Sequence, residues 1–329
     1  MGEEIGPFTA IAESALTEYG LEGASLTFIR HSDNVTFKVE APDSGAFLLR
    51  LHVPLTRAMG AHGADVAAVA SELAWLEALC RDTDLVLQKP IRNRQSNLVT
   101  PIAAEDRQVN CTLLHWMAGQ PYQRDLESEN TAFQIGEILA RLHLHASQWD
   151  PPAGFQRPRR DSAYFEAMLR GLRPAVSDGQ ISPSDYEVLE TSVALLIDML
   201  SALPQDRQTV GIMHADGHKG NMLYDAGRIR LIDFSFCAVG NYMFDLGICF
   251  ADMKEPLRRA FLGAYQSLRP LPGDYQRLVE GFFVGSMVGT FCYWVDNPKA
   301  RDLLVRKVSQ IAGDYAEKFN RGEFFWFQG

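Results

Sequence analysis

The chain has 329 residues, of which 47% are hydrophobic and 22% are charged, and its formal net charge is −10. These values are ordinary for a globular protein with one large domain or two smaller ones. The acidic balance and the lack of a basic block argue against nucleic acid and anionic membranes as partners. No signal-like start is present, and the longest uncharged run, 281–295, is short for a bilayer span. With five scattered cysteines, these features predict a cytoplasmic protein with reduced thiols.

The first third of the chain is predicted to form a small antiparallel sheet with helices beside it. A helix is expected over 8–19, because it ends at Gly20, a residue typical of helix C-caps. Turn-forming residues separate three strand-like runs, which favours a meander over a parallel crossover. Another helix is expected over 64–81. The expected strands are 24–30, 34–40, 46–51, 97–102 and 109–116.

After residue 116 the composition changes from strand-rich to helix-rich. We therefore predict an N-terminal lobe over 1–116 and a C-terminal lobe over 117–329. Apolar residues at helical spacing predict the helices of the second lobe. These expected helices are 130–147, 161–173, 183–202, 255–267, 274–295 and 300–320.

The most informative stretch is 212–247. Two strand-like runs, 220–224 and 228–232, flank a tight-turn signal at 225–227, so a hairpin would bring Asn221 and Asp233 together with Asp216 beside them. Oxygen donors of this kind suit Mg²⁺. The arrangement is the one that phosphoryl transfer needs, with one Asp for the acceptor hydroxyl and a metal on the nucleotide phosphates.

The spacing of these residues resembles the catalytic loop and metal-binding segment of protein kinases. His218 stands where protein kinases carry Lys, and the run is similar to the His-Gly-Asp-x-His-x-Gly-Asn loop of the aminoglycoside phosphotransferase and choline kinase-like family. Two residues depart from that loop, Ala215 and Gly217. The resemblance implies an α+β, bilobal protein-kinase-like fold, with a small antiparallel-sheet N-lobe carrying one main helix and a larger, mainly helical C-lobe.

The same resemblance assigns roles to the central residues. Asp216 is expected to act as the base, with His218 as a second catalytic or bracing residue. Asn221 and Asp233 are expected to bind Mg²⁺, and the nucleotide is expected to be ATP, with GTP as the alternative. His214 and Asp245 are expected to brace the loop by hydrogen bonds.

The first lobe would supply the nucleotide contacts. Arg50 takes the place of the family's Lys on the third strand, and Glu72 on the following helix would orient it, although Glu77 or a surface role for Arg50 also fits the sequence. Ser32 and Asn34 lie in the turn that covers the phosphates in such kinases.

The strand 109–116 leads into Gly119 and Pro121, which is typical of a hinge between lobes. The resemblance places the adenine contact near residues 114–117. His115 and Met117 are therefore expected to contact the nucleotide. The alternative for this strand is an ordinary sheet edge.

The acceptor is expected to be a small molecule with a hydroxyl group, such as an aminoglycoside, an amino alcohol or a related metabolite. Only twelve positions separate Asp233 from Asp245, too few for the long segment on which protein kinases hold a peptide. A bacterial protein Ser/Thr kinase and a nucleotide-binding protein that has lost catalysis are the two alternatives. Aromatic residues at 291–294, followed by Asp296, could also receive a cationic ligand.

Overall fold

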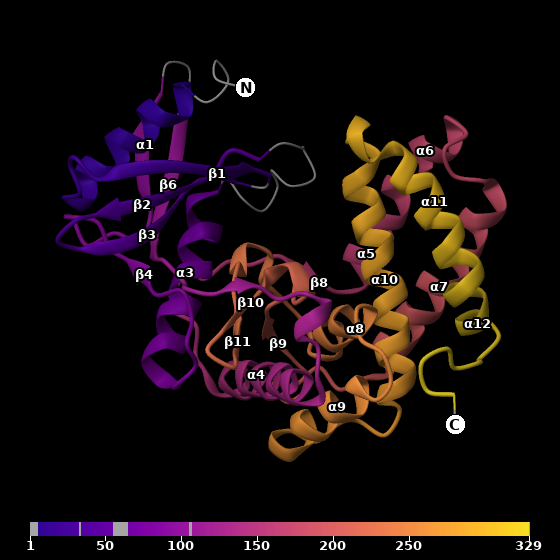
Figure 1. Cartoon of the computed structure of the whole chain (residues 1–329). Coiled ribbons are helices and arrows are strands. Elements are labelled where there is room, and N and C mark those ends of the chain that lie inside the picture. Colours follow the sequence, from indigo (N-terminus) through magenta and orange to yellow (C-terminus); the bar gives the residue numbers. More distant parts are fainter. Residues whose placement is uncertain (1–5, 33, 55–64, 105–106, 329) are drawn as a thin grey trace. The chain divides into compact units, whose positions relative to one another are not determined.

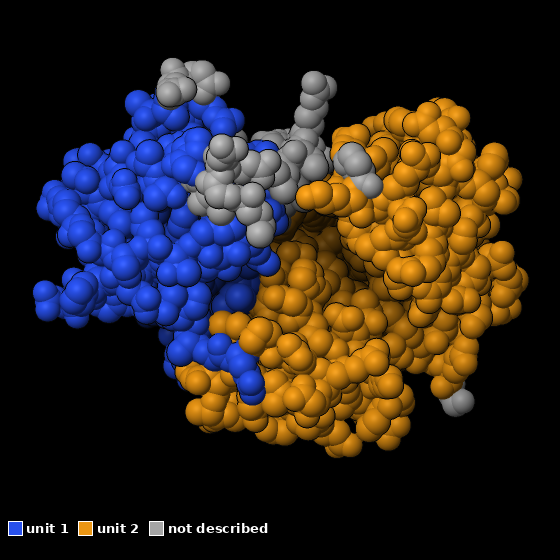
Figure 2. All heavy atoms as spheres, turned by 45° about the horizontal axis from the view of Figure 1, so that its top comes forward, with its two compact units in different colours: residues 1–120, 150–157, 232–235 blue, residues 121–149, 158–231, 236–329 orange. Residues whose placement is uncertain are grey.

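The computed structural model describes residues 6–32, 34–54, 65–104 and 107–328. The chain divides into two compact units, coloured separately in Figure 2. Unit 1 comprises Met1–Gln120, Asp150–Arg157 and Ile232–Ser235. Unit 2 comprises Pro121–Trp149, Pro158–Leu231 and Phe236–Gly329. Two short segments from later in the chain therefore belong to the N-terminal unit, and one of them carries Asp233.

Unit 1 is built on an antiparallel sheet in the strand order β1-β2-β3-β6-β4, with β5 also paired to β6. The first three strands form the predicted meander, with Lys38 of β2 opposite Leu48 of β3. The segment expected from residue 97 becomes a strand only from Thr100. The strands are β1 (Ser25–His31), β2 (Val35–Ala41), β3 (Gly45–Leu51), β4 (Pro90–Ile91), β5 (Thr100–Ala103) and β6 (Gln108–His115).

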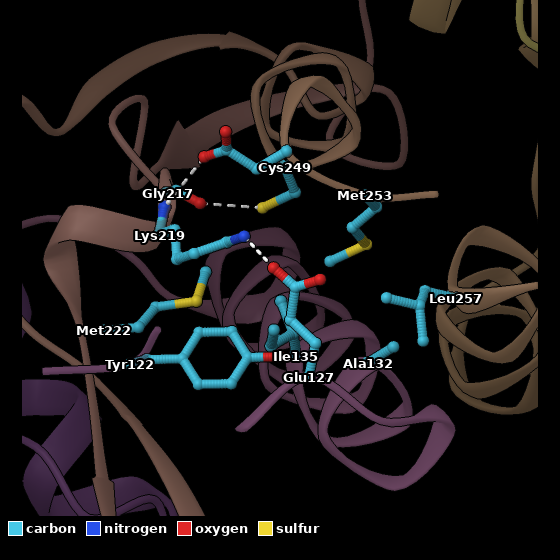
Figure 3. Close-up of a pocket in the computed structure, with 11 residues that line it drawn as sticks. Tyr122, Glu127, Ala132, Ile135, Gly217, Lys219, Met222, Cys249, Met253 and Leu257 are labelled. Carbon is cyan, nitrogen blue, oxygen red and sulfur yellow. Dashed lines mark hydrogen bonds and ion pairs between the residues drawn. The ribbon is translucent and has the colours of Figure 1, made fainter. Parts of the chain in front are cut away.

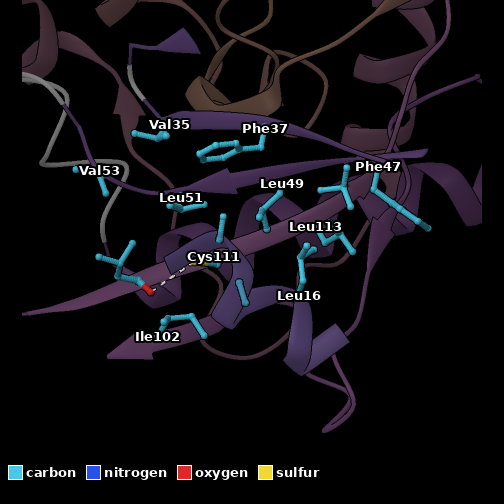
Figure 4. Close-up of a cluster of buried hydrophobic side chains, with 14 residues drawn as sticks. Leu16, Val35, Phe37, Phe47, Leu49, Leu51, Val53, Ile102, Cys111 and Leu113 are labelled. Carbon is cyan, nitrogen blue, oxygen red and sulfur yellow. Dashed lines mark hydrogen bonds between the residues drawn. The ribbon is translucent and has the colours of Figure 1, made fainter. Parts of the chain in front are cut away.

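The core of unit 1 lies between this sheet and helix α1 (Gly6–Tyr19), as Figure 4 shows. Alternate residues of a strand point to opposite faces, and Val35, Phe37 and Val39 of β2 all lie on the buried one. Leu16 of α1 packs in the same cluster. Burying a side chain of this size contributes about 1.5–3 kcal/mol, which fixes the register of the inner strands.

Helix α3 (Val66–Asp82) begins at Asp65, whose side chain accepts a hydrogen bond from the Ala68 amide at 2.9 Å. Such an N-cap satisfies one of the free amides of the first turn. The buried face of the helix includes Glu72 and Trp75. The Trp75 ring packs edge-on against Phe234, with 5.6 Å between ring centres, and this contact joins the segment 232–235 to unit 1.

Unit 2 is mainly helical, and several of its helices pack against α10 (Tyr275–Val295), seen in Figure 1. This helix is long and apolar enough to cross a membrane, but 61% of its apolar window is buried inside the structure, as in a core helix. The other helices are α4 (Glu129–Gln148), α5 (Ser162–Gly171), α6 (Arg173–Ser177), α7 (Pro183–Ala202), α8 (Met243–Ala251), α9 (Leu257–Leu268), α11 (Arg301–Ile311) and α12 (Glu317–Asn320), with α10 spanning Tyr275–Val295. An antiparallel sheet followed by helices confirms the predicted α+β class.

Short strands in unit 2 position the central loop. β9 (Val210–Met213) pairs with β12 (Ala238–Asn241), which pairs with β8 (Arg159–Arg160). β10 (Met222–Asp225) and β11 (Arg228–Leu231) form the predicted hairpin. Its turn residues Ala226 and Gly227 both have positive φ, 47° and 83°, as a tight hairpin turn requires. β7 (Gln120–Pro121) lies at the boundary between the units.

Three elements differ from the sequence predictions. The strand expected from residue 220 starts with a 3₁₀ turn, Lys219–Asn221, and becomes extended only at Met222. The helix expected over 161–173 ends at Gly171, since Pro174 lacks the amide that a continuing helix would use. The helix expected over 300–320 contains a π-helical turn at Ala312–Ala316.

The packing of α4 against α9 predicts opposite effects for two glycines. In Gly136→Ala the new Cβ would lie 2.9 Å from the carbonyl carbon of Phe261 and closer still to its oxygen, so the helices must separate. In Gly263→Ala on α9 the new Cβ meets no atom within 4 Å. We expect Gly136→Ala to destabilise the protein by about 1–3 kcal/mol and Gly263→Ala to stabilise it by about 0.4–1 kcal/mol. Thermal unfolding of both variants checks this, and equal midpoints would contradict the packing described.

Candidate active site

Unit 1 places a buried ion pair at the centre of its sheet. Arg50 of β3 donates from Nη2 to Glu72 Oε1 of α3 at 2.7 Å, and the two side chains are 4% and 2% exposed. A further hydrogen bond joins Arg50 Nε to the Thr112 hydroxyl on the neighbouring strand, at 3.3 Å. The guanidinium is thus fixed by a helix and a strand together, and Glu72, not Glu77, orients it. Glu77 instead pairs with Arg92.

Asp233 lies beside this pair. Its Oδ1 is 4.0 Å from Arg50 Nη1, and its Oδ2 is 3.3 Å from Arg30 Nη2. The side chain is 25% exposed, so it is accessible to a ligand while two cations offset its charge. The backbone has φ +66°, a conformation that costs a non-glycine residue energy and that is common at functional sites. Its amide donates to Gln88 Oε1 at 3.3 Å, which helps to hold the bend.

The turn before β2 has only part of its residues described. Asp33 lies outside them, while the Ser32 amide donates to the Asn34 carbonyl at 3.1 Å. Asn34 is buried, and its Oδ1 has no hydrogen-bond partner among the described residues. The phosphate contact expected of Ser32 and Asn34 stays a prediction.

The strand that leads out of unit 1 carries the residues expected to contact the nucleotide base. The His115 amide donates to the Lys89 carbonyl at 2.9 Å, and its ring packs on Phe47 at 5.4 Å between centres. Partial burial, together with nearby Lys89, lowers the pKa of His115, so the ring is neutral at pH 7. Met117 is buried. The contact of His115 and Met117 with a nucleotide remains a prediction.

In unit 2 the residues from Asp216 to Asn221 form a compact loop after β9. Asn221 Nδ2 donates to Asp216 Oδ2 at 2.7 Å and to the Asp216 carbonyl at 3.0 Å. His218 Nε2 is 3.6 Å from Asp216 Oδ1, while its Nδ1 accepts from the Gly220 amide at 3.0 Å. These contacts fix the Asp216 carboxylate, which stays 28% exposed. A fixed, accessible carboxylate is what a general base requires.

A fully buried carboxylate anchors this loop. Asp245 of α8 accepts from the His214 amide at 3.0 Å and from the Ala215 amide at 2.6 Å. It also accepts from His143 Nε2 at 3.0 Å, and the other ring nitrogen of His143 contacts the Tyr265 hydroxyl at 2.9 Å. The structure thus shows the bracing role expected of Asp245, and His143 completes it.

The two departures from the family loop leave its backbone intact. Ala215 has φ +60°, the left-handed conformation that favours glycine, so the loop bends here in spite of the Cβ. The Gly217 carbonyl accepts a hydrogen bond from the Cys249 thiol at 2.9 Å. A Cβ at Gly217 would lie 3.3 Å from the Cys249 sulfur, which is a tight contact. A small residue at 217 therefore fits the packing of this loop on α8.

The oxygen donors fit Mg²⁺ in chemistry. Because the Asn221 amide nitrogen is committed to Asp216, its carbonyl oxygen is the atom that a cation would use. Asp233 offers a partly exposed carboxylate. Mg²⁺ keeps several waters and needs only one or two carboxylates, and in the described part of the chain no cluster of three or more His, Cys, Asp or Glu offers a denser site. A metal shared by Asn221 and Asp233 stays a prediction.

A small pocket lies behind the loop in unit 2 (Figure 3). Lys219 and Glu127 point toward one another across it and form an ion pair, and Met222 and Met253 line its apolar side. Its volume of ≈ 10 Å³ is room for about one water molecule. The ion pair with Glu127 therefore fixes the Lys219 side chain. The pocket itself is too small for a substrate.

Sequence analysis missed several residues that hold the site. Gln88 supports the Asp233 backbone, Ser235 bonds to both Asp233 and Arg50, and Arg30 pairs with Asp233. Gln88 and Arg30 lie 145 and 203 residues from Asp233, and Ser235 lies 185 residues from Arg50, so no local signal marks these contacts. The contact of His143 with Asp245 could not be read from helical spacing.

Comparison with known proteins gives a consistent result. A model described as the phosphotransferase enzyme family matches residues 25–278. The chain is 30% identical over 230 residues to the homoserine kinase of Neisseria meningitidis serogroup B, a match that covers 64% of this chain and 69% of that protein.

Two solved structures show the same fold. One is the microcompartment-associated aminopropanol kinase, with a TM-score of 0.78, 23% identity, and coverage of 95% of this chain and 98% of that one. The other is an amicoumacin kinase in complex with AMP-PNP and Ca²⁺, with a TM-score of 0.77, 15% identity, and coverage of 100% and 98%. The predicted kinase-like fold is confirmed.

The buried contact of His143 with Asp245 predicts a pH dependence of stability. Burial lowers the pKa of His143, against the opposing effect of Asp245, so the folded protein keeps the ring neutral below the ordinary value of about 6.5. The unfolded chain takes up the proton first as the pH falls, so this contribution to stability is complete above about pH 6.5 and is lost below it. In His143→Gln, which keeps a donor for Asp245, the unfolding midpoint should fall less between pH 7 and 5 than in the wild type. Equal slopes would contradict this account.

Proposed function

Because the chain belongs to the phosphotransferase enzyme family and is a small-molecule kinase that phosphorylates a hydroxyl group, we propose that its acceptor is a compact amino alcohol or hydroxy amino acid and its donor ATP. The relatives named above act on homoserine, aminopropanol and amicoumacin, which supports a hydroxyl compound that also carries an amino group. The short span between Asp233 and Asp245 favours a small acceptor over a peptide.

The observation that carries the proposal is the fixed Asp216 carboxylate. Asn221 holds one of its oxygens at 2.7 Å, and the loop on which it lies is bonded through two consecutive amides to buried Asp245. We propose that Asp216 orients the acceptor hydroxyl and takes its proton as the oxygen bonds to the γ-phosphorus of ATP and the bond from that phosphorus to the ADP oxygen breaks, so that ADP leaves. Positioning of this kind supplies a large part of the rate in phosphoryl transfer.

The nucleotide side of the reaction is assigned to unit 1. Arg50, oriented by Glu72, would bind phosphate oxygens, a task that the family resemblance gives to a Lys at this position and that the permanent charge and planar fork of Arg also suit. Asp233 and Asn221 are the residues that would hold Mg²⁺, which neutralises phosphate charge when bound. The positive φ of Asp233 and the use of the Asn221 amide nitrogen by Asp216, which leaves the amide oxygen for a cation, support this assignment.

The ion pair of Arg50 and Glu72 can be tested for structure and function separately. Arg50→Met leaves Glu72 buried without its partner and should destabilise the protein by about 3–5 kcal/mol. The double variant Arg50→Met with Glu72→Met removes both charges and should recover most of that stability. It should not recover nucleotide affinity, which we expect to fall by about 10-fold or more, since a charge-assisted contact contributes roughly 1.5–3 kcal/mol.

Thermal unfolding and calorimetric titration with Mg-ATP measure the two effects. Arg50→Lys is the control that keeps the charge, and it should retain part of the stability and part of the affinity for Mg-ATP. If the double variant binds Mg-ATP as tightly as the wild type does, Arg50 does not contact the nucleotide.

Asp216→Asn tests catalysis directly. The amide cannot accept the proton of the acceptor, so turnover should fall by about 10²–10⁴-fold, while affinity for Mg-ATP stays within a few-fold. Asp233→Asn should instead weaken metal-dependent nucleotide binding. Intact-mass detection of phosphorylated product across homoserine, aminopropanols, choline and aminoglycosides identifies the acceptor. Binding of Mg-ATP without any product would show that the site does not catalyse transfer.

A further inference from the structure

The segment Asp150–Arg157 belongs to unit 1, although the residues on either side of it in the sequence belong to unit 2. Two hydrogen bonds fasten this segment to α3. The Gln156 amide donates to the Ser71 hydroxyl at 2.8 Å, and Arg157 Nη1 donates to the Ala68 carbonyl at 3.0 Å. Both acceptors lie on the buried face of the helix. The segment is therefore held against α3 from a distant part of the chain.

The same arginine also holds the segment Ile232–Ser235. Arg157 Nη2 donates to the Ser235 carbonyl at 2.6 Å. One guanidinium thus joins the backbone of this segment to the backbone of α3 at Ala68, one helical turn before Glu72. The planar fork of arginine presents its donors in fixed directions, whereas the ammonium of lysine is a compact charge on a flexible stem. An arginine is therefore suited to hold two carbonyls at a set separation.

From Ser235 the contacts continue to the groups that are proposed to bind the Mg-nucleotide. The Ser235 hydroxyl accepts from Arg50 Nη1 at 3.1 Å and donates to Asp233 Oδ1. Arg50 in turn pairs with Glu72 of α3 at 2.7 Å. Arg157 is therefore bonded to both of the segments that set the positions of Arg50 and Asp233, and all of these residues belong to unit 1.

Taking the proposed function as its premise, we propose that Arg157 is a positioning residue for the Mg-nucleotide. Its two Nη atoms are committed to backbone carbonyls, so it acts through α3 and the Ser235 backbone. Asp233 has φ +66°, a conformation that persists only where surrounding contacts hold it, and Arg157 bonds to the backbone two residues further on. Residues that orient a metal ligand without touching the metal change metal affinity or activity by about 10–100-fold when they are replaced.

Arg157→Met removes both hydrogen bonds and tests this role. We expect the Kd for Mg-ATP, and the Mg²⁺ concentration needed to bind ATP, to rise by about 10-fold or more. The KM for the acceptor should stay within a few-fold, because Asp216 lies in the other unit. Arg157→Lys keeps the charge but not the fork, and its affinity should lie between those of Arg157→Met and the wild type. Calorimetric titration with ATP at several Mg²⁺ concentrations measures the affinity without any acceptor.

Arg92→Met is the matched control. Arg92 also fastens α3, because it pairs with Glu77 at 2.6 Å, and it donates from Nη1 to the Ser96 carbonyl at 2.8 Å. Ala68 lies in the first turn of α3, whereas Glu77 lies in the second half of the helix. Both arginine variants should lower the unfolding midpoint, but only Arg157→Met should weaken the binding of Mg-ATP. An equal loss of affinity in both would reduce the role of Arg157 to general support of α3 and would overturn the proposal.

A double-mutant cycle tests the connection through Ser235. Ser235→Ala removes the hydroxyl that contacts Arg50 and Asp233, and it should weaken Mg-ATP binding by itself. If Arg157 acts by placing that hydroxyl, its replacement adds little once the hydroxyl is gone, and the two effects should be clearly less than additive. Additive effects would contradict the proposed connection.

The remaining outcomes separate this inference from the proposed function. Wild-type affinity for Mg-ATP in folded Arg157→Met would overturn the inference and leave the proposed function standing. If Arg157→Met does not fold, wild-type affinity in Arg157→Lys would overturn it equally. If the wild type binds Mg-ATP but phosphorylates no acceptor, the proposed function fails, and the binding measurements still decide the role of Arg157. A wild type that binds no Mg-ATP would refute both.

Discussion

The architecture of unit 2 depends on one buried carboxylate. Asp245 accepts two consecutive loop amides and a histidine, so a single side chain on α8 sets the backbone from which the Asp216 side chain extends. Charge-assisted bonds of this kind are short and strong, and a fully buried ion is tolerated only when its oxygens are satisfied. His143 satisfies Asp245 without adding a charge, since burial keeps the ring neutral. The loop is thus held rigidly by groups that never reach solvent.

Unit 1 also combines a buried carboxylate that positions other groups with a second carboxylate that is accessible. Glu72 on α3 is 2% exposed and orients Arg50, while Asp233 nearby is 25% exposed. In each unit, therefore, a buried carboxylate on a helix positions the polar groups around it, and a second carboxylate is left accessible. Asp216 fills the accessible role in unit 2. Because the two roles belong to different side chains, ligands can contact the accessible carboxylates while the buried carboxylates keep the backbone fixed.

The sequence was enough to predict most helices and strands and the motif around Asp216. It was not enough to predict the contacts that complete the site. Strand alternation and helical periodicity predicted most element types, and the spacing of Asp216 and Asn221 predicted their neighbourhood, because these are local properties of the chain. The contacts of Gln88 with Asp233 and of Ser235 with Arg50 could not be predicted, since each depends on packing between segments that are distant in sequence. Arg157 was hidden for a related reason: an arginine in a Pro- and Arg-rich stretch gives no sign that it will bond to carbonyls 89 and 78 residues away.

The make-up of unit 1 has a consequence for how the protein is synthesised. Its sheet lies within the first 120 residues, but the unit also includes Asp150–Arg157 and Ile232–Ser235. Phe234, which packs on Trp75, is synthesised only after the sheet of unit 1 and the helices α4 to α7 of unit 2. Cotranslational folding of the N-terminal unit must therefore pause with its sheet formed and one surface of α3 uncovered. A fragment that stops after the sheet would keep that apolar surface exposed, which makes it a poor candidate for expression alone and a natural client for chaperones.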